Sequence, residues 1–156
     1  MRSALERLFR PTVWGRGAIP KDERKYAVPL KRFALPALDL VFIYAGWYAV
    51  KSGIPSLDAL LPDDVGDVAS WAFVVAAVGA FLGIAFPSLW WLEIAAKCAL
   101  IGLLGTYWLA LRTLAAGDPA RDFISAIVLA AIVLPGLRLW ILGIELRDRR
   151  SGKVAS

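Results

Sequence analysis

Long runs of apolar residues dominate the sequence, and short clusters of charged and polar residues separate them. A helix needs about 20 mostly apolar residues to cross the roughly 30 Å hydrocarbon core of a bilayer. We place four such spans at about 33–50, 68–86, 89–111 and 120–144. No alternation of apolar and polar residues typical of strands competes with them. The pattern therefore predicts an all-α integral membrane protein with four transmembrane helices.

The last two spans are weaker candidates because their uncharged stretches, 98–111 and 123–137, have only 14 and 15 residues. The third includes Glu93 and Lys97, and the fourth includes Arg138. An alternative is that only two segments cross the membrane, while the other two are partial, interfacial or re-entrant. The distribution of charge outside the spans favours four crossings.

Basic residues gather at the two ends of the chain. Residues 1–32 contain nine Lys and Arg against three acids, and residues 145–156 contain four against two. The loop at 51–67 instead has one Lys against four Asp. Because Lys and Arg are enriched in cytoplasmic segments beside membrane spans, both ends are expected in the cytoplasm. This N-in/C-in topology requires an even number of crossings.

The chain is predicted to have three parts: a basic cytoplasmic leader at 1–32, a four-helix membrane bundle at 33–146 and a basic cytoplasmic tail at 147–156. Within the leader, Ser3 and Glu6 have the spacing of a capping box, which predicts a short amphipathic helix. The residues expected at a lipid interface with anionic headgroups are Arg2, Arg7, Arg10 and Trp14. Alternatively, the basic run only fixes the orientation of the first span.

The composition excludes most familiar active sites. Hydrophobic residues make up 59% of the chain, and there is no His, one Cys and one Met. These counts remove His-based triads, the HExxH zinc site and clusters of Cys and His around zinc. So much apolar mass also argues against nucleic-acid binding. We expect neither catalysis, nor a cofactor, nor a metal site.

Four ionisable residues lie inside the predicted spans and form the candidate functional site: Asp39, Glu93, Lys97 and Arg138. Asp39 lies about 9 Å and Arg138 about 10 Å from the cytoplasmic ends of their spans at 1.5 Å per residue. Charges in the membrane interior are costly and are usually paired or functional. We predict that Asp39 contacts Arg138, with Glu93 and Lys97 nearby as a second pair. Two alternatives are that Lys97 and Arg138 extend to the headgroups, or that Asp39 belongs to a proton or ion pathway.

Small residues at four-residue spacing predict two helix-packing faces, because they let helix backbones approach closely in a membrane. One face holds Gly79 and Gly83 in the second span, and the other holds Cys98, Gly102, Thr106 and Ala110 in the third. We expect these faces to pack the second span against the third within one molecule. Use of one face by a second copy of the chain is the alternative.

In size, helix density and charged tail (Arg147 to Lys153), the chain is similar to holins and resembles the small multi-span membrane proteins of bacteriophages that infect high-GC bacteria. The resemblance covers the architecture of the whole chain and rests on no residue motif. It implies an oligomerising protein of the bacterial inner membrane that permeabilises this membrane at a set time. The implied partners are the bilayer and further copies of the chain or another membrane protein.

Two other functions are open on the sequence alone. The first is a membrane-anchored binding module: an adaptor, an immunity or superinfection-exclusion protein, or an accessory subunit of a membrane complex. The second is a small transporter or channel subunit that works through Asp39.

Overall fold

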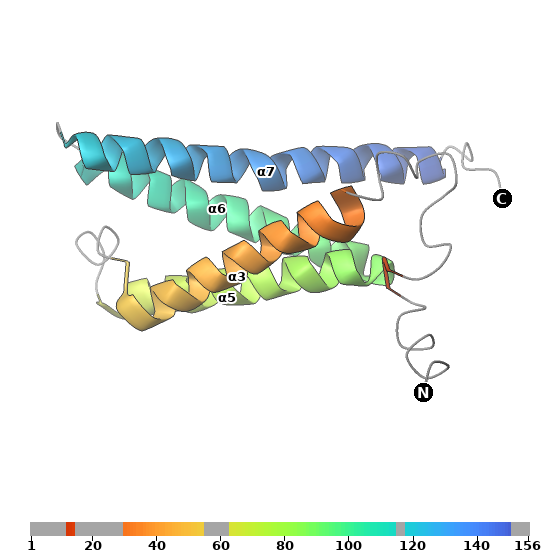
Figure 1. Cartoon of the computed structure of the whole chain (residues 1–156), viewed down its shortest axis with the longest axis horizontal. Coiled ribbons are helices and arrows are strands. Elements are labelled where there is room, and N and C mark those ends of the chain that lie inside the picture. The colour runs from red at the N-terminus through yellow and green to blue at the C-terminus, as the bar shows by residue number, and fades with distance from the viewer. Residues whose placement is uncertain (1–11, 15–29, 55–62, 115–117, 151–156) are drawn as a thin grey trace.

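The computed structural model describes residues 12–14, 30–54, 63–114 and 118–150. Its four long helices are α3 (Leu35–Ser52), α5 (Asp63–Ala85), α6 (Trp90–Leu114) and α7 (Pro119–Arg150), which form an antiparallel bundle (Figure 1). Two short elements, η1 (Leu30–Ala34) and η2 (Pro87–Leu89), precede α3 and α6. The described residues contain no strand, so the predicted all-α class is confirmed for them.

All four helices are long and apolar enough to cross a membrane. Two of them differ from the predicted spans by more than three residues at one end. α5 begins at Asp63 rather than at residue 68, so its first turns contain Asp63, Asp64 and Asp67. Acidic residues are favourable there because the amino-terminal end of a helix has a partial positive charge. α7 continues to Arg150, beyond the predicted end at 144, and runs without a break through Pro135.

The helices pack in chain order. Close backbone contacts connect α3 with α5, α5 with α6, and α6 with α7, whereas α3 hardly meets α6 or α7 among the described residues. The rings of Phe42 and Phe73 join α3 to α5 edge to face, with centroids 6.1 Å apart. Gly46 allows this approach, because a Cβ at its position would lie 2.8 Å from the Phe73 ring.

The glycines of α5 lie against the beginning of α6, as predicted. A Cβ on Gly79 would be 3.3 Å from the Cβ of Ala96. A Cβ on Gly83 would lie only 2.5 Å from the Cβ of Glu93 and 2.6 Å from its Cα. Backbone and backbone therefore meet at Gly83, and a side chain there would force α5 and α6 apart. The predicted role of Gly79 and Gly83 in packing the second span against the third is confirmed.

The prediction for the third span was wrong at three of its four positions. Cys98, Gly102 and Thr106 are exposed on α6, and only Ala110 is buried. A Cβ on Gly102 would meet nothing within 4 Å. The reason is that α6 packs through its other side, where larger buried residues such as Leu100 and Leu104 contact the core.

A short segment of the leader lies against the bundle. The N–H of Val13 donates to the carbonyl of Ala85 at the end of α5 (3.0 Å), and the Trp14 indole donates to the carbonyl of Arg32 (3.0 Å). Thr12 and Val13 are buried. The predicted amphipathic helix, with Arg2, Arg7 and Arg10, lies outside the described residues. The lipid contact predicted for these residues and Trp14 stays a prediction.

Candidate functional site: a buried cluster of paired charges

The four charges of the predicted spans gather in one half of the bundle, the half where α3 begins and α5 ends; we call it the charged half. Asp39 comes from the second turn of α3, Glu93 and Lys97 lie one turn apart near the start of α6, and Arg138 projects from α7. All four are buried, with exposed fractions of 0%, 2%, 1% and 7% in chain order. The sequence thus identified the members of this charge cluster correctly.

Two ion pairs hold the charge cluster together. Nζ of Lys97 donates to Oδ1 of Asp39 at 3.0 Å, which ties α6 to α3. Nε and Nη2 of Arg138 donate to the two carboxylate oxygens of Glu93 at 2.7 and 3.2 Å, which ties α7 to α6. The second pair is bidentate, the geometry in which Arg binds a carboxylate most strongly.

The predicted pairing of Asp39 with Arg138 was wrong. The order of packing explains the difference, because α6 adjoins α7 and α3 packs mainly on α5. Glu93 therefore meets Arg138 directly, and the long side chain of Lys97 reaches Asp39 across a wider gap. The alternative in which Lys97 and Arg138 extend to the headgroups is also contradicted, since both side chains are buried and hydrogen-bonded.

The charge cluster has two positive and two negative groups, so its formal charge is zero. Removing one partner from a buried ion pair leaves the other charge buried without compensation, which strongly destabilises the fold. One acceptor is left over: among the described residues, no group donates to Oδ2 of Asp39. The close approach at Gly83 places the backbone of α5 against Glu93 and shields this side of the charge cluster.

The arrangement acts electrostatically. Each carboxylate of the charge cluster forms an ion pair with a Lys or Arg of the same chain. Neither carboxylate is therefore left without a cation partner as a candidate general acid or base. Within the described ranges, no group of three or more His, Cys, Asp or Glu residues could hold a metal ion. What the geometry supplies is a clamp that fixes α3 and α7 to α6. The expected absence of catalysis stays a prediction.

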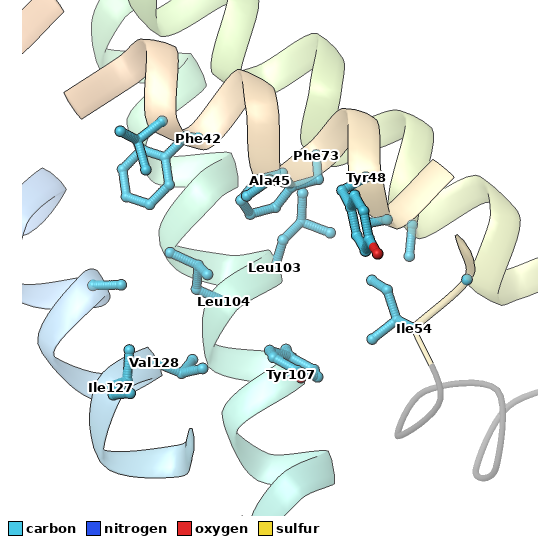
Figure 2. A pocket seen from close by; sticks show the side chains of 15 residues that line it. Phe42, Ala45, Tyr48, Ile54, Phe73, Leu103, Leu104, Tyr107, Ile127 and Val128 are labelled. Atoms are coloured by element: carbon cyan, nitrogen blue, oxygen red, sulfur yellow. The ribbon is translucent and has the colours of Figure 1, made fainter. Parts of the chain in front are cut away.

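The other half of the bundle, toward Ser52, is built differently, and no sequence pattern predicted its structure. A cavity of about 540 Å³ lies there between the helices and opens on one side. Its walls are almost entirely apolar and include Phe42, Tyr48, Phe73, Leu104, Tyr107 and Val128 (Figure 2). We call this the hollow half. Only the packing of the helices, which hydropathy does not determine, could have revealed it.

Comparisons of the chain with protein-family models, with curated proteins and with solved structures found no match. The function is therefore inferred from the sequence and from the geometry of the described residues.

Proposed function

We propose that the protein is a non-enzymatic membrane protein that self-associates in the bacterial cytoplasmic membrane and permeabilises it in the manner of holins. The observation behind this proposal is the exposed small-residue face of α6, made of Cys98, Gly102 and Thr106. Lipid chains are as apolar as the helix surface, so helices associate in membranes where small residues permit close approach. Gly79 and Gly83 of α5 already pack against α6 within the chain, whereas a Cβ at Gly102 on this face of α6 would meet nothing within 4 Å.

The charge cluster supports association between folded copies. Its charges are paired within one chain, so no second copy is needed to neutralise them. Each copy is then a complete bundle that presents its α6 face to the lipid. If all copies insert N-in/C-in, a two-fold axis along the membrane normal brings each residue of this face opposite itself.

The native Cys98 makes this proposal directly testable. Its side chain is exposed on the α6 face. In membranes that contain the full chain, mild oxidation or a short bis-maleimide is expected to give a cross-linked dimer, and Cys98→Ser removes it. Gly102→Leu is expected to reduce the dimer strongly, because a bulky side chain separates the two backbones. Gly143→Leu is the matched control, since Gly143 is also exposed with open space around its Cα.

The same variants test the activity. Induced expression of the wild-type chain in bacteria is expected to collapse the membrane potential abruptly after a lag and to stop growth. Gly102→Leu is expected to abolish the collapse, and Gly143→Leu to preserve it. Growth with an intact potential would overturn the permeabilising function. Cross-linking of Cys98 to a different protein, without a dimer, would overturn self-association in favour of an adaptor or accessory subunit.

A further inference from the structure

The cavity of the hollow half lies where α3 separates from its neighbours. α3 packs on α5 and has few close backbone contacts with α6 and α7, so a gap lies between α3 and these two helices. Figure 2 shows Phe42 at one end of this gap, Tyr48 and Ile54 toward the other, and Leu104 and Tyr107 beneath. In a chain that spans a membrane, the open side of this cavity faces lipid.

An empty space of this kind is unfavourable. Protein interiors are close-packed, and the lining of a void loses its dispersion contacts. Water is a poor occupant, because an apolar wall gives it few hydrogen-bond partners. The volume of about 540 Å³ lies within the range of roughly 300–1,000 Å³ typical of small-molecule sites. These properties call for an apolar occupant taken from the surroundings.

The depth of the cavity distinguishes a lipid chain from a helix. Its lining follows α3 from Val41 and ends just beyond the helix at Gly53 and Ile54. From Val41 to Gly53 the rise is about 18 Å at 1.5 Å per residue. This is about half of the roughly 30 Å hydrocarbon core, which is one leaflet. A transmembrane helix from a second copy needs a face along the whole core, yet the charged half is closed by the charge cluster and by Gly83 against Glu93.

The mouth of the cavity is complementary to a phospholipid headgroup. Tyr48 and Tyr107 belong to the lining, and tyrosine favours the membrane interface, where its hydroxyl meets the headgroups. Lys51 follows Tyr48 by one turn of α3, is exposed, and holds its ammonium 5.2 Å from the ring centroid of Trp47. Lys51 and Trp47 lie outside the cavity lining, on the neighbouring side of the same turns of α3. A cation at this level of α3 has the charge complementary to a lipid phosphate.

We propose that the cavity binds one acyl chain of a phospholipid from the leaflet at the Ser52 end, with the phosphate beside Lys51. The chain enters sideways between α3 and α7 and ends near Phe42. This site is independent of the α6 face and would exist in a single copy of the protein.

The test uses the full chain reconstituted in vesicles of phosphatidylglycerol that carry a photoreactive diazirine near the end of one acyl chain. After illumination, mass spectrometry locates the labelled residues. Labelling is expected to concentrate on the cavity lining, above all on Leu104 and Phe42. Labelling spread evenly over lipid-facing residues such as Leu137 and Trp140 would overturn the proposal.

Two adjacent alanines of α7 provide matched variants. Ala131 lines the cavity, and Ala130 is exposed outside it. Ala131→Trp is expected to lose most of the cavity labelling, and Ala130→Trp to retain it. Equal labelling in both variants would overturn the proposal. Should Ala131→Trp fail to give the helical circular dichroism of the wild type, Ala45→Leu fills the cavity from α3 and is judged by the same loss of labelling.

Lys51→Ala tests the headgroup contact separately. It is expected to lower the preference for phosphatidylglycerol over a diacylglycerol with the same photoreactive chain, which lacks the phosphate. An unchanged preference would overturn the assignment of the phosphate to Lys51. None of these measurements depends on the dimer formed through Cys98, so failure of the lipid site and failure of self-association are distinguishable.

Discussion

The charged half and the hollow half of the bundle join the same four helices in opposite ways. In the charged half, glycines bring α5 and α6 together, and two ion pairs connect α6 to α3 and α7. In the hollow half, α3 stands away from α6 and α7, and an apolar cavity replaces contact. A strong polar clamp at one level of the bundle thus permits loose packing at another.

The largest effect is expected from breaking the bidentate pair. Arg138→Leu leaves Glu93 buried without its partner, which costs about 3–5 kcal/mol of stability. Unfolding of the purified chain in mixed detergent micelles, followed by circular dichroism, measures this loss. The double variant Glu93→Leu with Arg138→Leu is expected to recover most of it. A single variant as stable as the wild type would show that the clamp does not hold α7.

The next effect concerns which charges are partners. A double-mutant cycle on Asp39 and Lys97 is expected to give a coupling energy within the roughly 0.5–3 kcal/mol typical of residues in direct contact. The cycle on Asp39 and Arg138 is expected to give a smaller value, because Asp39 accepts from Lys97 and Arg138 donates to Glu93. The reverse order would restore the pairing that the sequence alone predicts.

Alanine substitutions at Gly83 and Gly102 are expected to have different effects on the free energy of unfolding. Gly83→Ala is expected to destabilise the bundle by about 1–3 kcal/mol, as overpacking does, because its Cβ would lie 2.5 Å from that of Glu93. Gly102→Ala has open space and is expected to leave the unfolding free energy of the single bundle nearly unchanged. Equal losses would contradict the close approach of α5 to α6.

The smallest effect is expected at the ion pair of the hollow half. Arg112 and Asp122 are 3.0 Å apart, with about half of each side chain exposed. Such exposed pairs contribute about 0–1 kcal/mol and weaken with salt. Asp122→Asn is therefore expected to change stability by less than about 1 kcal/mol at low salt, and by still less in 1 M NaCl. A loss as large as that of Arg138→Leu would remove the distinction between the two halves.

The sequence correctly predicted the features that depend on the residues along a single helix. Four helices long and apolar enough to cross a membrane, the gathering of the four charges and the use of Gly79 and Gly83 all follow from hydropathy and spacing. Properties that depend on the order of helices in space did not follow. The spacing that places Gly83 against α6 also occurs at Cys98 and Gly102, which face outward because α6 packs through its larger residues.

The partners of Asp39 and Arg138 were missed for the same reason. The position of a charge along its helix gives its level but not the helix beside it, and Asp39 and Arg138 each pair with a residue of α6 instead of with each other. The cavity likewise results from the absence of packing between helices that are individually ordinary. Such a gap leaves no pattern in the residues that border it.

The length of α7 has a mechanical consequence. Its 32 residues extend about 48 Å at 1.5 Å per residue, well beyond the roughly 30 Å that the hydrocarbon core requires. The same unbroken helix contains Arg138 and continues to Arg150. The final turns thus project beyond the point at which Arg138 binds Glu93. A pull on this basic end would act on that ion pair, because the same helix contains both.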